Sequence, residues 1–400
     1  DVFLKTLKLL SDFFYVVIIV LTLFGAGMLN HLHSQKMPGK KALLIISNGK
    51  STKINGYLKR TEEQLQKAGV EFTIFDQIEA NPLKSTVMAG GNAARTNGCD
   101  FIVALGGGSV MDASKAIAVM ATNDGDYWDY IPSGSGKGKI ITNVPLPIIA
   151  ITTTAGTGSE TDPGCVITNE TTHEKTGFVH PALFPVLAIV DPELMLSVPP
   201  KFSAYQGFDA LFHSIEAYVS NGANLMSDMY ALTAIENVSL NLPKTIKNGN
   251  DIEARTKVAF GNTLSGSVMC VGRCNSEHSL EHAMSAYHQE LPHGAGLIMI
   301  SKAYFTHLIK QHVCDDRFIK IAKVMGMKNA TRPMDFIAAL TKLQEDCGVA
   351  DLKMSDYGIT PDEFEKFAIN AKDTMGFLFS CDRIPLSNED CINIYAASYK

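Results

Sequence analysis

Two groups of side chains in the second half of the chain have the types and spacing of metal ligands. Asp209 and His213 are four residues apart in the segment FDALFHSIEAYVS. In a helix, positions four residues apart lie on one face, so this carboxylate and this imidazole would lie side by side. Four of the eleven histidines follow in the segment EHSLEHAMSAYHQELPHGAG, at His278, His282, His288 and His293. One carboxylate and three imidazoles form a nitrogen and oxygen donor set suited to Fe²⁺, Zn²⁺ or Mn²⁺.

Each of these residues also has an ordinary structural explanation. A single His213 is more often a hydrogen-bonded core or surface histidine than a ligand, and Asp209 could cap a helix or pair locally. The two segments together favour a metal site, because a helical domain can bring an acid and an imidazole against two further imidazoles. We expect His282 to face a substrate, with an outer-sphere position, a proton relay or a surface position as alternatives, and His288 to be exposed.

Two loops in the first half of the chain are suited to binding phosphate groups. The segment FIVALGGGSVMDASKAIAV reads as a strand, three glycines and a helix, with Ser109 as the expected N-cap and Asp112 at the third helical position. Glycines let the backbone approach a ligand, and free amides at a helix N-terminus favour a phosphate. The loop TTTAGTGSE (residues 152–160) follows another strand, and open α/β sheets bind dinucleotides at the carboxyl ends of their strands. The alternative for each loop is a tight turn without a ligand.

The turn SNGKS (residues 47–51) bears on the choice of dinucleotide. Sites selective for NAD usually place an acid near the adenosine ribose, where it binds the 2′-hydroxyl. This turn contains no carboxylate, and Asn48, Gly49, Lys50 and Ser51 would tolerate a 2′-phosphate, which Lys50 and Ser51 could bind. The sequence therefore favours NADP over NAD.

Alternating segments must position these loops. Strand-like runs occupy residues 41–47, 70–76, 100–109, 145–154 and 186–192, separated by stretches of helical length, which predicts a parallel, doubly wound, Rossmann-like sheet. Helical periodicity then dominates near residues 203–219, 223–240, 251–271, 275–286, 295–309, 316–326, 332–346 and 361–373. The double proline Pro199-Pro200 predicts a boundary between an α/β dinucleotide-binding domain, residues 1–198, and an all-helical metal and substrate domain, residues 199–400.

Bulk properties narrow the class of protein. A chain of 400 residues is more than one hydrophobic core usually serves, and a net charge of −6 without a basic stripe argues against a nucleic-acid partner. Eight scattered cysteines without a CxxC pair indicate free thiols in a reducing cytoplasm. Residues 13–29 carry no charge and reach the lower length of a membrane span. Their β-branched run and two glycines favour two short buried strands joined by a turn, although an inserted run would tether the protein to a membrane.

These motifs together resemble the iron-containing (group III) alcohol dehydrogenase family. Residues 106–118, 153–160 and 188–192 are similar to the family's cofactor-binding half, and residues 209–220 and 278–294 are similar to its metal-binding half. The resemblance extends over residues 13–400 and is closest to the NADP-preferring butanol dehydrogenase-like branch. It implies a metal-dependent alcohol dehydrogenase or aldehyde reductase that transfers a hydride between NAD(P) and a small primary alcohol or aldehyde. We expect a cytoplasmic homodimer.

The resemblance also implies roles for individual residues. The cofactor residues would be Gly106, Gly107, Gly108, Ser109 and Asp112 at the pyrophosphate loop, Thr153, Thr154 and Thr157 at the nicotinamide end, Lys175 beside the cofactor, and Asn48, Gly49 and Ser51 near the ribose. The metal ligands would be Asp209, His213, His278 and His293, holding Fe²⁺ or alternatively Zn²⁺ or Mn²⁺, with His282 near the nicotinamide and the substrate. The spacing from His278 to His293 is one residue longer than is usual in the family, so a bulge in the turn before His293 is expected.

Two other activities on the same scaffold are alternatives. One is the polyol oxidation of glycerol dehydrogenases, and the other is a lyase reaction of the dehydroquinate synthase type. A lyase acting on an anionic substrate should need more basic residues, whereas the metal segments add only Lys201 and Arg273.

Overall fold

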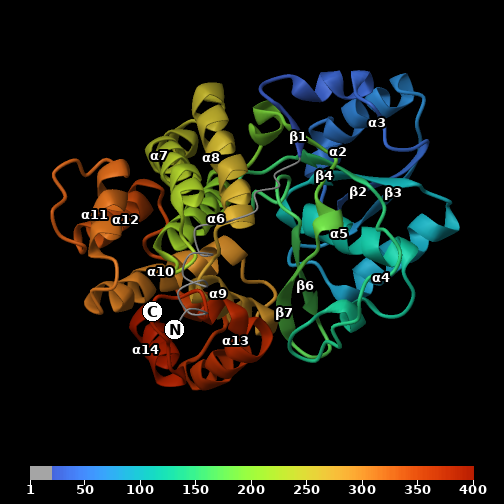
Figure 1. Cartoon of the computed structure of the whole chain (residues 1–400). Helices are drawn as coiled ribbons and strands as arrows, with labels where there is room; N and C mark the ends of the chain where they lie inside the picture. The colour runs from blue at the N-terminus through green and yellow to red at the C-terminus, as the bar shows by residue number, and fades with distance from the viewer. Residues whose placement is uncertain (1–19) are drawn as a thin grey trace, which may run out of the picture.

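The computed structural model describes residues 20–400 and places a six-stranded parallel sheet in the first half of the chain (Figure 1). The strand order is β1-β8-β5-β4-β2-β3. The strands are β1 (Leu21–Phe24), β2 (Lys41–Ser47), β3 (Glu71–Ile78), β4 (Phe101–Gly106), β5 (Ile148–Thr152) and β8 (Leu187–Val190). From β2 the chain passes first to β3 on one side and then to β4 on the other, so the direction of winding reverses between β2 and β4.

Both faces of the sheet are covered, as the predicted doubly wound fold requires. Along β2, Leu43 and Ile45 pack in the core beneath α4 and α5, whereas Leu44 and Ile46 pack in a second core with η1 and α3. Because both faces are buried, the strand is apolar throughout rather than alternating. The covering helices and turns are η1 (Met28–Ser34), α2 (Ser51–Ile54), α3 (Tyr57–Lys67), α4 (Lys84–Thr96), α5 (Gly108–Thr122), η2 (Tyr127–Tyr130), η3 (Pro181–Leu183) and η4 (Pro192–Met195).

The second half of the chain is helical and lies beside the sheet (Figure 1). Its elements are α6 (Pro200–Val219), α7 (Leu225–Lys247), α8 (Ile252–Val271), α9 (Ser276–Tyr287), α10 (His293–Lys310), α11 (Asp315–Val324), α12 (Asp335–Asp346), η5 (Met354–Tyr357), η6 (Pro361–Glu363), α13 (Phe364–Phe379) and α14 (Asn388–Ser398). All eight predicted helices are present, and α14 is an addition. Pro200 is the first residue of α6, where a missing amide hydrogen costs nothing.

An antiparallel hairpin joins the two halves and was not expected from the sequence. Its strands are β6 (Gly164–Asn169) and β7 (Glu174–Val179). In Figure 1 the hairpin lies between the sheet and helices α9 and α13. The two strands are short and partly polar, so their own sequence carries little of the strand signal.

The apolar N-terminal run is only partly described. Residues 21–24 form β1, which pairs in parallel with β8 at the sheet edge. The expected second strand after the glycine turn is wrong: Met28–Ser34 is a 3-10 helix, because Leu29 and Leu32 turn into the core below α3. Residues 13–19 lie outside the described part. Between residues 20 and 400, no helix combines the length and the apolarity needed to cross a membrane.

Candidate metal centre and cofactor site

Three of the four predicted metal ligands face one carboxylate oxygen of the fourth. Oδ1 of Asp209 lies 3.3 Å from Nδ1 of His213, 3.5 Å from Nε2 of His278 and 3.5 Å from Nε2 of His293. Donors bound tetrahedrally at 2.0–2.1 Å from one ion are separated by about 3.4 Å, which is close to these three distances. The atoms that all lie within 4.8 Å of one another are those of Asp209, His278 and His293, and His213 approaches this group through Asp209. Asp209 and His213 come from α6, His278 from α9, and His293 is the first residue of α10.

The donor atoms are buried and lack other partners. Asp209 and His278 are 5% and 4% exposed. Within residues 20–400, Asp209 Oδ1, His213 Nδ1 and His278 Nε2 have no hydrogen-bond partner. Buried polar atoms are nearly always satisfied in folded proteins, so three such atoms facing one another fit a bound cation.

Two buried glutamates orient the histidines and were not anticipated. Nδ1 of His278 hydrogen-bonds Glu216, and Nδ1 of His293 hydrogen-bonds Glu281. Both carboxylates are fully buried. A carboxylate on one ring nitrogen keeps the proton there and leaves the other nitrogen free for a metal. The signal in the sequence was an acid three residues after His213 and another three residues after His278.

The electrostatics of this group favour positive charge at its centre. Burial opposes the charge of Asp209, yet the surrounding imidazoles hold the pKa of that carboxyl well below its ordinary value. Burial likewise opposes a charge on His278 and His293, but Glu216 raises the pKa of His278 well above its usual range and Glu281 raises the pKa of His293. The folded chain thus gathers three carboxylates around these two imidazoles, an environment that attracts a cation.

His282 and His288 have different surroundings. His282 is buried, its ring centroid is 5.2 Å from that of His293, and its Nδ1 is 2.7 Å from Sδ of Met375. Burial and then the charge of Lys175 lower the pKa of His282 well below its ordinary value, so the imidazole is neutral. The expectation that His288 is exposed is wrong: it is partly buried, and Nε2 is 3.0 Å from Glu363.

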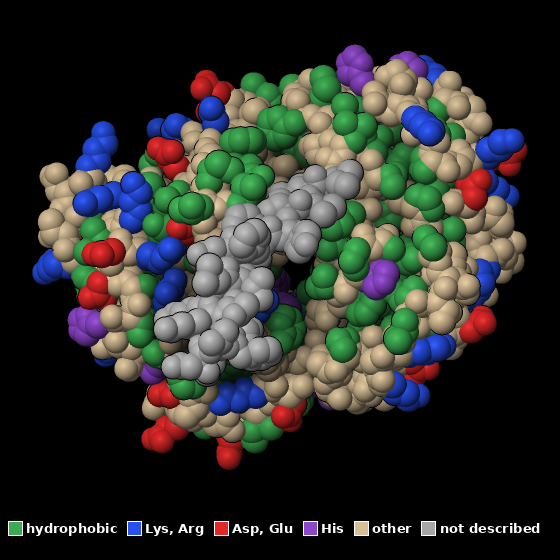
Figure 2. Space-filling view, viewed as in Figure 1, with side chains coloured by type: hydrophobic (Ala, Val, Ile, Leu, Met, Phe, Trp, Pro, Cys, Tyr) green, Lys and Arg blue, Asp and Glu red, His purple; other side chains and the backbone are tan. Residues whose placement is uncertain are grey.

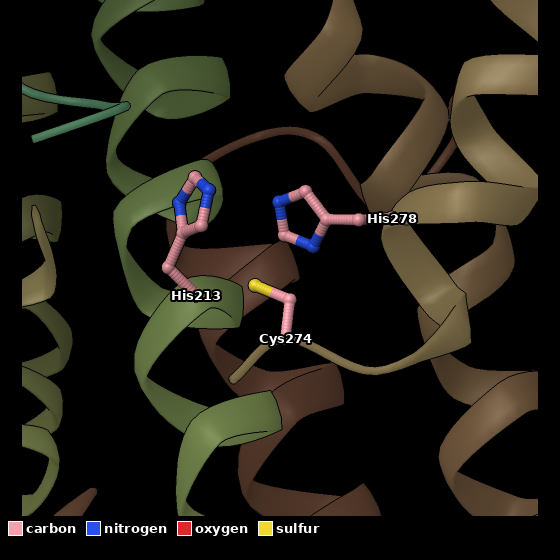
Figure 3. A group of neighbouring side chains, drawn as sticks. All are labelled: His213, Cys274 and His278. Carbon is pink, nitrogen blue, oxygen red and sulfur yellow. The ribbon is translucent and has the colours of Figure 1, made fainter. Parts of the chain in front are cut away.

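Cys274 is a further possible metal donor that is absent from the ligands predicted from the sequence. The thiol belongs to the loop before α9, and its sulfur reaches the gap between the rings of His213 and His278 (Figure 3). Burial raises the pKa of this thiol to about 12, so it is protonated in the absence of a cation. The spacing of four residues between Cys274 and His278 was a signal in the sequence, but the contact of Cys274 with His213 joins segments 61 residues apart.

The two predicted cofactor loops lie together at the carboxyl edge of the sheet. Gly106 pairs with Thr152 across β4 and β5, and the amide of Thr153 donates to the carbonyl of Gly106 at 2.9 Å. A Cβ at Gly107 would lie 2.7 Å from Oγ1 of Thr154, and one at Gly108 would lie 2.3 Å from Cγ2 of Thr157. The glycines are therefore needed for the close approach of the two loops. The N-terminus of α5, with its free backbone amides, lies beside the point where the direction of winding reverses between β2 and β4. Open α/β sheets bind dinucleotides at such a point.

The cofactor loop also reaches the histidine centre. A Cβ at Gly156, in the middle of the second loop, would lie 3.2 Å from Oδ2 of Asp209. The dinucleotide-type loop thus passes close beside the carboxylate, although the two come from opposite halves of the chain. On the face in Figure 2 a hollow opens between those halves, and most of the charged side chains on this face lie toward the outer margin of the molecule rather than beside the hollow.

Some predicted cofactor residues are engaged elsewhere. The N-cap of α5 is Gly107, not Ser109, because the helix begins two residues earlier than expected. Asp112 is buried and accepts hydrogen bonds from Ser159 Oγ at 2.7 Å and from the amide of Val166 at 2.8 Å, so it braces the second loop and β6.

Lys175 is buried beside α9, whereas the SNGKS turn is mostly exposed at the end of β2. Nζ of Lys175 is buried and hydrogen-bonds Asn81 at 3.1 Å and Ser285 at 2.9 Å, with Glu281 at 3.4 Å. Asn48 and Ser51 are exposed at the carboxyl end of β2, next to the glycine loop across the pairing of β2 with β4.

A dinucleotide-type sheet whose loop passes beside a buried carboxylate, with three imidazoles around that carboxylate, indicates a class: a nicotinamide-dependent oxidoreductase that uses a metal ion. The chain belongs to the iron-containing alcohol dehydrogenase family, since residues 21–192 match "Iron-containing alcohol dehydrogenase" and residues 203–399 match "Fe-containing alcohol dehydrogenase family, C-terminal". It is an NAD(P)-dependent, metal-dependent alcohol dehydrogenase.

Relatives and solved structures agree with this assignment. The chain is 33% identical to 1,3-propanediol dehydrogenase of Klebsiella pneumoniae, over 84% of this chain and 85% of the relative. It is 30% identical to the NAD-dependent methanol dehydrogenase of Bacillus methanolicus, over 88% and 91%. The crystal structure of an archaeal halo-thermophilic alcohol dehydrogenase from a Red Sea brine pool superposes with a TM-score of 0.92 at 31% identity, covering 97% of this chain and 99% of that one. Neither the polyol nor the lyase alternative is favoured.

Proposed function

We propose that the enzyme interconverts small primary alcohols and aldehydes and that Asp209, His213, His278 and His293 hold its metal ion. The observation that carries this proposal is the placement of three imidazole nitrogens 3.3–3.5 Å from one carboxylate oxygen. The relatives named for 1,3-propanediol, methanol and butanol all act on primary alcohols, which supports this substrate class.

Fe²⁺ is the proposed ion, with Zn²⁺ and Mn²⁺ as alternatives that accept the same donors. A divalent ion bound there supplies a Lewis acid for the substrate oxygen. Asp209 contributes the negative charge of the donor set. Glu216 and Glu281 hold the protons of His278 and His293 on Nδ1, which leaves Nε2 of each ring facing Asp209.

His282 is the proposed proton carrier. Burial and the charge of Lys175 keep the pKa of His282 low, so the ring is neutral and would hold a proton from an alcohol hydroxyl only briefly before releasing it to solvent. The contact between Nδ1 and Met375 leaves Nε2 as the nitrogen for this transfer. The ring of His282 lies tilted against that of His293, with the centroids 5.2 Å apart, which supports a place next to the metal ligands.

For the cofactor, we assign residues 1–198 to the dinucleotide domain and residues 199–400 to the metal and substrate domain. The amides of Gly106, Gly107, Gly108 and Ser109 would hold the pyrophosphate, and Thr153, Thr154 and Thr157 would line the nicotinamide end. Asp112 and Lys175 would support the cofactor site indirectly, since the side chains of both are buried and hydrogen-bonded to other protein groups.

NADP is proposed as the preferred cofactor. Asn48, Gly49, Lys50 and Ser51 present no carboxylate to a ribose 2′-hydroxyl, and the cation of Lys50 is exposed. An acid of the neighbouring strand β3, Asp76, is paired with Lys53 at 2.6 Å. Two relatives are named as NAD-dependent and NADH-dependent, so the preference for NADP over NAD is to be measured on this enzyme.

The free thiols of the eight cysteines support a cytoplasmic location. A homodimer remains a prediction, which light scattering on the purified protein would test.

The test of function is an activity screen with metal analysis. Protein loaded anaerobically with Fe²⁺ should reduce a series of short aldehydes with NADPH or NADH. The double variant His278→Ala, His293→Ala should lose its metal and about a thousandfold in activity, the several kcal/mol that a Lewis acid supplies. His31→Ala, at an exposed histidine, is the control. Full activity of the double variant would overturn the assignment.

A further inference from the structure

The candidate metal centre has a sulfur donor on one side. Cys274 is 3% exposed, and its Sγ and a nitrogen from each of His213 and His278 all lie within 4.8 Å of one another. Figure 3 shows the thiol and the two rings facing a common gap, with His213 on α6 and with Cys274 and His278 four residues apart, in the loop before α9 and in α9 itself. Neither Asp209 nor His293 belongs to this group of three, so it is displaced from the group that Asp209 forms with His278 and His293.

The surroundings of Cys274 are rich in soft donors. Sγ of Cys274 is 3.3 Å from Sδ of Met269 on α8. Met375, on α13, packs in the same small cluster and is buried. Thiolates and thioethers bind thiophilic cations, whereas carboxylates favour harder ions. The centre is therefore soft on the side of Cys274 and harder on the side of Asp209.

The nitrogen between the two sides is uncommitted. His278 is 4% exposed, and its Nε2 has no hydrogen-bond partner in the part of the chain from residue 20 onward. Glu216 occupies the other nitrogen of the ring. His278 can thus serve an ion on either side, but not two ions at once through one lone pair.

We propose that Cys274, His213 and His278 form a second binding position, for a thiophilic cation such as Zn²⁺, which competes with the Asp209 position for His278. The proposal rests on the proposed function in that both positions share His213 and His278. On binding, the S–H bond of Cys274 is replaced by a sulfur–metal bond, and the proton passes to the buffer. No electron transfer is involved. Cys274 thereby makes the choice of metal at this centre depend on the supply of zinc relative to iron.

The experiment compares metal binding in wild-type protein, Cys274→Ser and Cys274→Ala, all freed of metal by chelation. Cys391→Ser is the matched control, because Cys391 is an equally buried free thiol outside the histidine cluster. Co²⁺ serves as a spectroscopic probe, and Zn²⁺ and Mn²⁺ affinities are measured by competition with chelating dyes. Thermal denaturation verifies that each variant is folded.

The expected result is a sulfur-to-cobalt charge-transfer band in wild type and in Cys391→Ser that is absent from both Cys274 variants. The Zn²⁺ affinity of Cys274→Ser should fall by about tenfold or more, as for loss of a metal-supporting group, with Mn²⁺ affinity unchanged. A wild-type spectrum without that band, or equal Zn²⁺ affinity in Cys274→Ser, overturns the proposal.

Two outcomes separate this proposal from the function it rests on. If Mn²⁺ does not bind wild-type protein, the Asp209 centre fails, whereas the cobalt band still decides the role of Cys274. If both Cys274 variants unfold, zinc-edge X-ray absorption of wild-type protein decides instead. A sulfur neighbour at about 2.3 Å supports the proposal, and a shell of nitrogen and oxygen alone overturns it.

Discussion

Replacing Glu216 by glutamine tests how the buried carboxylates hold the metal ligands. Oε1 of Glu216 hydrogen-bonds Nδ1 of His278, and its Oε2 accepts from the amide of Asn275 at 2.8 Å. Glutamine has the same shape but only one acceptor. If its oxygen stays with Asn275, its NH₂ group faces Nδ1 and forces the ring proton onto Nε2, the atom that faces Asp209. If the amide is reversed, the Asn275 amide loses its acceptor.

The magnitude follows from this exchange of a proton position. A nitrogen that carries a proton cannot bind a cation, so binding must first reverse the tautomer against the glutamine NH₂. Loss of such an orienting carboxylate weakens metal binding by about 10- to 100-fold, which is about 1.4–2.7 kcal/mol. The fold should tolerate the change, because the side-chain volume is nearly conserved.

The assay is equilibrium dialysis of wild type and Glu216→Gln against Mn²⁺ and, without oxygen, Fe²⁺. Glu236→Gln on the exposed face of α7 is the matched control and should bind as wild type does. Equal affinities for wild type and Glu216→Gln, with the variant folded, would refute the orienting role and weaken the assignment of His278 as a ligand.

Three further outcomes are expected. Burial raises the pKa of Glu160 to about 7 from 4.5, so between these pH values the folded state retains a proton that the unfolded state releases. The free energy of unfolding therefore falls as the pH rises through this range. In Glu160→Gln the melting temperature should no longer show this dependence on pH. Gly98→Ala should cost about 1–2 kcal/mol of stability, because its backbone is left-handed and nothing else lies near the new Cβ. Gly158→Ala should cost a further ~1–3 kcal/mol, because its Cβ would also lie 2.3 Å from the Gly266 amide nitrogen. Calorimetry should therefore find a lower melting temperature for Gly158→Ala than for Gly98→Ala. Asn48→Asp should shift kcat/KM toward NADH by about tenfold, the effect of an acid at the ribose; an unchanged cofactor ratio would remove the SNGKS turn from the binding site.

Regular elements with strong local patterns were predictable from the sequence. Strand β2 has the predicted bounds, because a strand buried on both faces is apolar without interruption. The hairpin of β6 and β7 escaped prediction since its strands are short and partly polar, and they are held by packing between the halves of the chain. The N-cap expected at Ser109 lies two residues earlier, at Gly107, a shift too small for local propensity to decide.

In the candidate site, too, local spacing was predictable from the sequence and long-range packing was not. Spacing along the chain determined that Asp209 and His213 share a helix face, because helical geometry alone places residues four apart together. It also placed the glycine loop at a strand end. Only the tertiary structure brought His278 and His293 to the same carboxylate, set Glu216 and Glu281 behind them, and turned Cys274 toward the rings. Those contacts join elements tens of residues apart, and their geometry depends on how α6, α9 and α10 pack, which no local pattern encodes.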